Sequence, residues 1–220
     1  MGEFIYRGRH IRRVGFFGLG RSNTGVKEYL DRKFPGLECI LRCDREVCAE
    51  GFSRITFGAD AYAEPYEDVV FISPGVRRDR DGFAKMERCG VTLSSDAELF
   101  IESCQVPIFA VSGSDGKSTT TTMAASILNA PAVGNIGVAM SPLLLNDDIR
   151  CVAAELSSFQ LLWQRPKVRR AAITNISPNH LDWHRSYEEY ISAKENLLME
   201  AEERVFNLDY EVSQRILGRH

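Results

Sequence analysis

The sequence predicts an α/β protein built on mostly parallel sheets. Short apolar runs alternate along the chain with segments of helical periodicity. Several of these runs end in glycines or polar residues, which is typical of parallel strands that carry ligand-binding side chains at their carboxyl ends. The chain has 220 residues, enough for one large or two small domains. Its 44% hydrophobic and 26% charged residues are ordinary for a globular protein and exclude a disordered, collagen-like or coiled-coil chain.

The first half of the chain predicts one α/β unit, which we expect to end at residue 105. A buried strand over residues 14–18 leads into a glycine-rich turn, and the helix that follows ends at Pro35-Gly36. The expected elements are strands at residues 14–18, 37–41, 69–72 and 91–93 and helices at residues 26–34 and 82–89.

A second unit, expected over residues 106–220, has the same alternation. Its first strand, at residues 106–111, runs directly into a second glycine-rich turn and then into a helix that reaches about residue 128. The remaining expected elements are strands at residues 151–154, 171–174 and 205–207 and a helix at residues 186–203.

Charge and cysteine patterns exclude several classes of protein. The chain has 27 Lys and Arg residues against 30 Asp and Glu residues, which gives no support to a general nucleic-acid surface. It has neither an apolar run long enough to span a membrane nor an apolar secretion signal at its N-terminus, so we expect a cytoplasmic protein. Its six cysteines form no Cys-x-x-Cys pair, which favours free thiols over a metal site.

The strongest local signal is Gly113-Ser-Asp-Gly-Lys-Ser-Thr119, between a predicted strand and a predicted helix. Glycines let several backbone N–H groups face one anion, and the helix N-terminus adds partial positive charge. Lys117 could then reach terminal phosphate oxygens, and Ser118 could bind Mg²⁺. The loop has two residues between its glycines where the general nucleotide loop has four. The alternative is an ordinary glycine turn that caps a helix, which the Lys-Ser-Thr sequence disfavours. We expect the phosphate-binding residues to be Gly113, Ser114, Asp115, Gly116, Lys117, Ser118 and Thr119.

Polar residues also follow two later strands of this unit. Glu155 ends a hydrophobic strand and would suit a hard cation, and His180 lies in the polar loop after another strand. Lys194 lies on the helix after that loop. Taken singly, Glu155 fits a solvated strand end as well as it fits a metal ligand. A loop histidine is usually solvated or hydrogen-bonded, and a helix lysine is usually a surface residue. Three strand ends that carry Lys117, Glu155 and His180 in turn indicate a common site.

These motifs together resemble the Mur ligase family. The phosphate loop, Gly134-Asn-Ile-Gly137, Glu155-Leu-Ser-Ser-Phe-Gln-Leu161 and Asn179-His-Leu-Asp182 occur in the family's order. Gly18-Leu-Gly20 and Ser73-Pro-Gly75 match its first domain, so the resemblance extends over essentially the whole chain. It implies a Rossmann-like domain that binds a UDP-linked substrate, followed by a P-loop-type central ATPase domain.

The resemblance also implies an activity and a role for each matching residue. Members are ATP-dependent ligases of peptidoglycan synthesis; here D-glutamate would be added to UDP-N-acetylmuramoyl-L-alanine through an acyl phosphate. Ser118 and Glu155 would hold one Mg²⁺ and His180 a second, with Lys194 carbamylated by CO₂ as a further metal ligand. The implied substrate-binding residues are Arg21, Ser22, Asn23, Asp44, Arg45, Ser73, Gly75, Asn135, Ser157 and Gln160.

Three alternatives remain, one for the first unit and two for the activity. The turn at Gly18–Gly25, with Asp44 further on, could be a dinucleotide site, but its spacing departs from Gly-x-Gly-x-x-Gly. Folylpolyglutamate synthetase shares the phosphate loop, although the stretch from Glu155 and the UDP-type first domain disfavour it. A UDP-sugar-binding protein without turnover is the non-enzyme alternative.

The resemblance predicts more chain than is present. Family members continue the central domain and then add a third domain that binds the incoming amino acid. We therefore expect the 220-residue chain to be inactive alone, with the carboxyl-terminal part absent or supplied by a separate chain.

Overall fold

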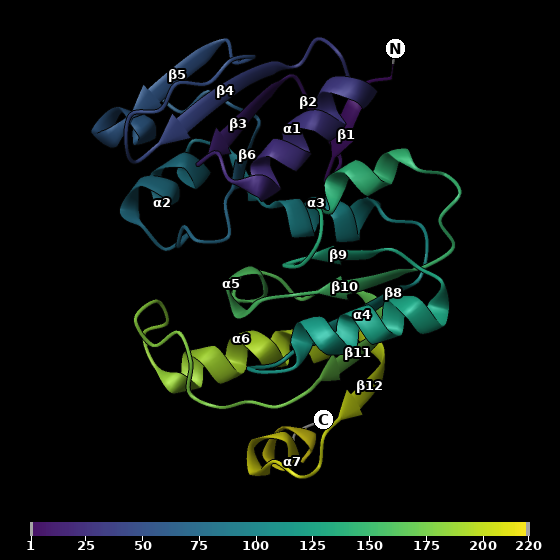
Figure 1. Ribbon diagram of the computed structural model, residues 1–220. Helices are drawn as coiled ribbons and strands as arrows, with labels where there is room; N and C mark the ends of the chain where they lie inside the picture. Colours follow the sequence, from purple (N-terminus) through teal and green to yellow (C-terminus); the bar gives the residue numbers. More distant parts are fainter. Residues whose placement is uncertain (1, 219–220) are drawn as a thin grey trace. The chain divides into compact units, whose positions relative to one another are not determined.

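The computed structural model describes residues 2–218 and divides into two compact units (Figure 1). Unit 1 takes in the chain up to Leu99 together with Ala139–Leu145. Unit 2 takes in Phe100–Val138 and the chain from Asn146 onward. Among the described residues, no helix is both long and apolar enough to cross a membrane.

Unit 1 is built on a five-stranded parallel sheet in the order β5-β4-β3-β6-β7. Phe16 pairs with Leu41 on one side and Phe71 on the other, and all three are fully buried. The strands are β3 (Arg13–Phe17), β4 (Glu38–Cys43), β5 (Arg54–Phe57), β6 (Val69–Ile72) and β7 (Thr92–Ser94). A separate antiparallel hairpin is formed by β1 (Phe4–Tyr6) and β2 (Arg9–Ile11).

Both faces of this sheet are covered by apolar side chains. Successive residues of a strand point to opposite faces, so Phe16 and Phe17 belong to different core clusters. Phe16 packs in the cluster that includes Leu30 of α1 (Arg21–Lys33), and Phe17 packs in the cluster that includes Phe83 of α2 (Asp81–Arg88). The remaining helical segments of the unit are η1 (Gly58–Tyr62), η2 (Ser141–Leu145) and the start of α3 (Asp96–Ser103).

A buried ion pair ties the sheet of unit 1 to the segment that follows β5. Arg42 Nε and Nη2 donate to the two carboxylate oxygens of Glu67 at 2.5 and 2.9 Å, and both side chains are almost completely buried. Nη1 of Arg42 also donates to the carbonyls of Ala61 and Ala63, at 3.0 and 3.1 Å. These bonds satisfy the buried charges and fix the backbone on either side of Tyr62.

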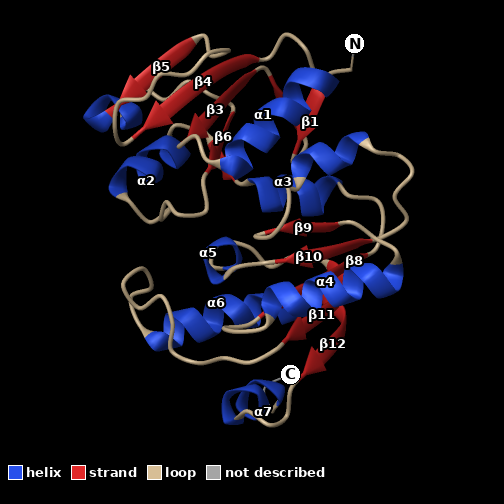
Figure 2. Ribbon diagram, in the orientation of Figure 1, coloured by secondary structure: helices blue, strands red, loops and turns tan. Residues whose placement is uncertain are grey.

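Unit 2 has a second five-stranded parallel sheet, in the order β12-β11-β8-β10-β9. Figure 2 shows its strands and helices by class. The strands are β8 (Ile108–Ser112), β9 (Ala132–Gly134), β10 (Val152–Glu155), β11 (Val168–Ile173) and β12 (Ala201–Phe206). The helices are α4 (Lys117–Leu128), α5 (Ser158–Leu161), α6 (Tyr187–Met199) and α7 (Glu211–Leu217).

The structure corrects two predicted boundaries. The helix expected from residue 26 begins at Arg21, because the glycine-rich turn is shorter than its composition suggests. The helix expected to reach residue 203 ends at Met199, and the chain from Ala201 instead pairs with β11 as β12. Several short elements have no predicted counterpart: β1, β2, β5, β9, α3, α5 and α7.

Candidate functional site

The phosphate loop of unit 2 is held by the end of β11. Gly113 has φ 148°, and a Cβ there would lie 1.9 Å from Oγ1 of Thr174, so only glycine fits. Asn175 accepts from the Asp115 backbone N–H and donates to the Asp115 carbonyl, at 2.9 and 3.0 Å. The Ser114 N–H donates to the Asn175 carbonyl at 2.9 Å. The predicted loop is therefore shaped by residues about 60 positions later in the chain.

The loop leads directly into helix α4, whose first residue is Lys117. Gly116 is the N-cap in a left-handed conformation, and the first turn contains no acidic residue. Nζ of Lys117 donates to the Ser114 carbonyl at 2.8 Å, within the loop itself. An exposed helix N-terminus with a lysine and hydroxyl side chains in its first turn is suited to a phosphate group.

Glu155 lies at the end of β10 and is 1% exposed. Its Oε2 accepts from Ser118 Oγ at 2.7 Å, and its Oε1 accepts from Asn135 Nδ2 at 2.8 Å. Within the part of the chain that the structure describes, no lysine, arginine or histidine forms an ion pair with it. A buried carboxylate with hydroxyl and amide donors but no cation has the donor chemistry of a Mg²⁺ site.

Asn135 is positioned by a glycine turn at the edge of the same sheet. Its backbone N–H donates to the Glu155 carbonyl at 3.0 Å. Gly134 before it has φ 101°, and a Cβ there would lie 2.2 Å from the same carbonyl oxygen. The close approach of the two backbones therefore depends on glycine at residue 134.

Ser157 and Gln160 form a capping box at the start of α5. The Ser157 side chain accepts from the Gln160 N–H at 3.4 Å, and the Gln160 side chain accepts from the Ser157 N–H at 2.9 Å. These bonds fix both side chains just beyond the end of β10.

Lys194 is 1% exposed on helix α6, which confirms the predicted inward face. Its Nζ donates to the Gly113 carbonyl at 2.7 Å and lies 4.6 Å from the centre of the Tyr190 ring. The pKa of Lys194 is lowered from 10.5 to about 7: burial is the largest cause and Lys117 acts in the same direction, whereas Glu155 and Asp115 oppose them. The ammonium and the neutral amine are therefore both populated near neutral pH.

His180 is exposed, in the loop between β11 and α6. Its backbone has φ 53°, in the left-handed region, and its ring packs on that of Phe159 with a centroid distance of 5.0 Å. Within the described residues, no group of three or more His, Cys, Asp or Glu side chains could hold a metal ion.

The predicted residues of unit 1 lie at the carboxyl ends of β3, β4 and β6. Gly18 has φ 79°, and its carbonyl accepts from the Ser73 hydroxyl at 3.3 Å. Asn23 is fully buried and donates to the carbonyls of Phe17, Gly18 and Phe71, so its amide holds the turn together. The other predicted residues are exposed or half-buried: Arg21, Ser22, Asp44, Arg45, Ser73 and Gly75.

Arg80 and Tyr62 also reach this edge, and neither was predicted as a site residue. Nη1 of Arg80 donates to both carboxylate oxygens of Asp44, at 2.9 and 2.8 Å, and to Tyr62 Oη at 2.9 Å. In unit 2 the unpredicted contacts are made by Tyr190 and Asn175. Tyr190 Oη lies 2.8 Å from Ser114 Oγ. Its position one helical turn before Lys194 was the feature of the sequence that could have identified it as a site residue.

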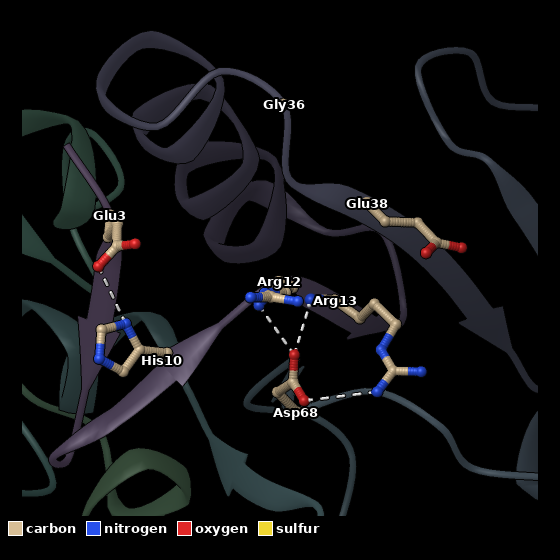
Figure 3. A pocket seen from close by; sticks show the side chains of 7 residues that line it. All are labelled: Glu3, His10, Arg12, Arg13, Gly36, Glu38 and Asp68. Atoms are coloured by element: carbon tan, nitrogen blue, oxygen red, sulfur yellow. Dashed lines mark hydrogen bonds and ion pairs between the residues drawn. The ribbon is translucent and has the colours of Figure 1, made fainter. Parts of the chain in front are cut away.

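An open pocket of unit 1 lies at the other edge of the sheet, where the strands begin (Figure 3). Asp68 accepts there from the backbone N–H groups of Arg12 and Arg13, and His10 pairs with Glu3. None of its lining residues was predicted as a site residue. The candidate ligand positions therefore lie at the carboxyl edges of both sheets.

Two parallel sheets, with a phosphate loop beside the buried Glu155, define an α/β protein of the phosphate-loop class, and the chain belongs to the Mur ligase family. The family model for the Mur ligase middle domain matches residues 111–219. Among curated relatives, "UDP-N-acetylmuramoylalanine--D-glutamate ligase" of Acetivibrio thermocellus is 36% identical over 228 residues, which cover 94% of this chain and 48% of the relative. The protein of the same name from Clostridium botulinum (strain Okra) is 41% identical over 203 residues, 84% of this chain and 44% of the relative.

Solved structures share the fold. UDP-N-acetylmuramate:L-alanyl-gamma-D-glutamyl-meso-diaminopimelate ligase from Neisseria meningitides has a TM-score of 0.62 and 18% identity, over 96% of this chain and 75% of that one. UDP-N-acetylmuramate-alanine ligase from Thermotoga maritima has a TM-score of 0.55 and 19% identity, over 94% of this chain and 51% of that one. The chain spans about half the length of the curated relatives it matches.

Proposed function

We propose that this chain supplies the nucleotide-sugar and ATP phosphate sites of an ATP-dependent ligase that adds D-glutamate to UDP-N-acetylmuramoyl-L-alanine in the cytoplasm. The observation that carries the proposal is the phosphate loop with Ser118 bonded to the buried Glu155. The names of the relatives at 36% and 41% identity support the choice of substrate.

Each unit has a separate task in this proposal. The UDP group would bind at the carboxyl edge of unit 1, against Arg21, Ser22, Asp44, Arg45 and the Ser73–Gly75 turn. The ATP phosphates would bind over residues 113–119 of unit 2, with Asn135, Ser157 and Gln160 directed to the sugar part of the substrate. Asn23 would hold the unit 1 turn rather than contact the ligand, because its amide is engaged with three backbone carbonyls.

The proposed reaction has two steps. The substrate carboxylate attacks the γ-phosphorus of ATP, which forms an acyl phosphate and releases ADP. The amine of D-glutamate then attacks the acyl carbon, so that a C–N bond forms, the C–O bond to phosphate breaks and the amine loses a proton. Lys117 and the loop N–H groups would hold the transferred phosphoryl group, which carries most of the negative charge during the transfer.

Magnesium would be held by this chain's own oxygen and nitrogen donors. Ser118 and Glu155 fit one Mg²⁺; His180 and a carbamylated Lys194 would hold a second. Two bound Mg²⁺ ions would offset the negative charge of the phosphoryl group. Carbamylation fits the burial of Lys194, which favours the neutral amine. The amine nitrogen would form a bond to the carbon of CO₂ as one C=O π bond breaks, and the nitrogen would lose a proton, which leaves a carbamate anion.

A binding measurement tests the phosphate and UDP sites. We expect calorimetry to show that the chain binds UDP-N-acetylmuramoyl-L-alanine without ATP, and binds Mg·ATP more weakly after Lys117→Ala. Loss of a charged contact to phosphate corresponds to roughly a tenfold loss of affinity or more. Lys167→Ala is the matched control, since this exposed lysine precedes β11 at the opposite edge of the sheet. Unchanged Mg·ATP binding by Lys117→Ala, or binding of NAD(H) in place of the UDP compound, would contradict the assignment.

A ligase assay tests turnover. We expect no product from the 220 residues alone, because catalysis requires both reactants to be held together and the amino-acid site is expected outside them. Addition of the carboxyl-terminal half of a relative should give product with D-glutamate. If the chain binds the UDP compound but gives no product, either alone or with the added carboxyl-terminal half, a UDP-sugar-binding protein would be favoured. Product with a folate substrate would favour folylpolyglutamate synthesis.

A further inference from the structure

His184 is a buried polar residue that the proposed function does not use. Its side chain has no exposed surface, and its Nε2 lies 2.9 Å from Ser158 Oγ of helix α5. Its Nδ1 lies 3.3 Å from Oε2 of Glu189, in the first turn of helix α6. The contact to Glu189 is an ion-pair distance without hydrogen-bond geometry, so the bond to Ser158 is what defines the orientation of this buried ring.

The Glu189 carboxylate biases which nitrogen of the ring carries the proton. A carboxylate beside Nδ1 favours the tautomer that carries the proton on that nitrogen. Nε2 is then the acceptor, and the Ser158 hydroxyl donates to it. His184 thus connects α5, which follows Glu155, to α6, which carries Lys194.

The ring is also enclosed by aromatic side chains from the same elements. Tyr190 and Trp183 meet it edge to face, at centroid distances of 5.2 and 4.8 Å. Phe159, the neighbour of Ser158, lies 5.8 Å away. The Ser158 bond and these three rings together confine the side chain.

His184 ends the turn that contains His180. The His184 N–H donates to the His180 carbonyl at 2.9 Å, so the two residues are the ends of one hydrogen-bonded turn. His180 itself has φ 53°, which costs free energy for a residue with a Cβ and persists only where the surroundings enforce it. Its ring lies on Phe159, one residue from the serine that holds His184.

We propose that His184 is a positioning residue: its bond to Ser158 fixes the residue 180–184 turn on α5 and thereby places His180. The placement follows from the contacts above; its consequence for phosphate and metal binding rests on the proposed function. Removal of the bond should let the His180 ring leave Phe159 while the rest of unit 2 stays folded.

The test removes the hydrogen bond without leaving a buried polar group unpaired. A double variant, His184→Phe with Ser158→Ala, replaces both partners by apolar groups, which is nearly neutral for stability. His184→Gln is the conservative variant, because its amide oxygen can accept from the Ser158 hydroxyl. Asn196→Ala is the matched control: it removes another bond from α6 to α5, the 3.0 Å contact to the Leu161 carbonyl, away from the turn.

The position of His180 is read by NMR of the histidine rings in the full chain. The sequence has four histidines, and the His180 signal is identified by its loss in His180→Gln. In the wild type the Phe159 ring shifts this signal away from that of the exposed His10. We expect the double variant to move it toward the His10 position, His184→Gln to restore it and Asn196→Ala to leave it unchanged. An unmoved signal in the double variant, or an equal movement in Asn196→Ala, would overturn the proposal.

A second measurement separates the placement from the proposed function. Calorimetry should show that the double variant binds Mg·ATP about tenfold more weakly, as expected for loss of a contact that orients a ligand residue. A shifted His180 signal with unchanged affinity would refute a metal or phosphate role for His180 and leave the placement intact. Absence of Mg·ATP binding by the wild type would refute the proposed function, and the NMR result would still decide the placement.

Discussion

At the scale of single residues, Lys194 shows how burial, aided by a neighbouring lysine, changes the chemistry of a side chain. A helix lysine is ordinarily a solvated ammonium, whereas this one is 1% exposed and has a pKa lowered to about 7. Its one strong hydrogen bond is to a carbonyl of the phosphate loop. The same environment that weakens the ammonium therefore places a reactive amine against the loop.

We expect Lys194 to make the stability of the protein depend on pH. Between pH 7 and about 10.5 the unfolded chain binds a proton at this residue and the folded chain does not, so stability rises with pH in that window. Below pH 7 Lys194 is protonated in both the folded and the unfolded chain, and the buried charge destabilises the folded chain to its full extent. The free energy of unfolding of the wild type, minus that of Lys194→Met, should rise by at most about 1.4 kcal/mol per pH unit there.

The measurement is urea unfolding in CO₂-free buffer, which prevents carbamylation during the titration. Lys167→Met is the control, since that lysine is exposed and its substitution should give a difference that does not vary with pH. A flat difference for Lys194→Met as well would mean that the amine is solvated in the folded chain.

At the scale of elements, the backbone contact between β9 and β10 places Asn135 beside Glu155. We expect Gly134→Ala to disrupt it, because the added Cβ would meet the Glu155 carbonyl at 2.2 Å. Gly36 has almost the same φ, 103° against 101°, but nothing lies within 4 Å of its Cβ position. Gly36→Ala therefore measures the cost of the backbone angle alone, about 1 kcal/mol or more.

Urea unfolding of the two variants should show that Gly134→Ala costs at least about 1 kcal/mol more than Gly36→Ala, as is usual for overpacking. Equal costs would mean that β9 moves away from β10 without loss. In that case the Asn135–Glu155 hydrogen bond would not depend on glycine at this position.

The elements also show what sequence could predict. The phosphate loop was predictable because its glycines, Lys117 and Ser118 are adjacent and its chemistry is local. The five-residue strands β3 and β8 were predictable from continuous apolar runs. Helix α5 has four residues and strand β9 three, too few for a period to emerge, and both are held by contacts to distant segments.

Pairings between distant residues could not be predicted for the same reason. Arg42 and Glu67 are 25 residues apart, and either alone reads as a surface charge. Asn175 lies about 60 residues after the loop it clamps, and Arg80 lies 36 after Asp44. A single sequence shows which residue types end each strand. Which of those residues contact each other depends on the order of the strands in the sheet, and that order is known only from the structure.

At the scale of the whole molecule, residues 139–145 pack with unit 1, although they lie within the second half of the sequence. Asp96, 2% exposed, accepts from the backbone N–H groups of Met140 and Ser141 at 3.0 and 2.9 Å. It also accepts from the Ser141 hydroxyl at 2.5 Å. Ala139 fills the space beside Gly25 of α1, where a Cβ would lie 2.3 Å away.

We expect Asp96→Ala to release this segment. Two backbone donors would lose their acceptor, which costs about 1–3 kcal/mol for each buried group left unpaired. Hydrogen exchange at Met140 and Ser141 should accelerate, and the free energy of unfolding should fall. Asp81→Ala is the matched control, because Asp81 also begins a helix but is exposed. Equal protection of both amides in the two variants would contradict the role of Asp96.

Because every strand in the two five-stranded sheets is parallel, the amino edges are separate from the candidate ligand positions, and this matters for chemical labelling. Cys89, Cys104 and Cys151 each lie just before a strand begins, and Cys89 is exposed. Cys43 ends β4 at the carboxyl edge, but it is buried and burial raises its pKa. Little of the reactive thiolate is therefore present, and Cys43 reacts slowly. Cys48, which follows the carboxyl end of β4, is exposed as well. A maleimide dye would thus report from the edge away from the UDP position only after Cys48→Ser, with Cys89 as the labelled thiol.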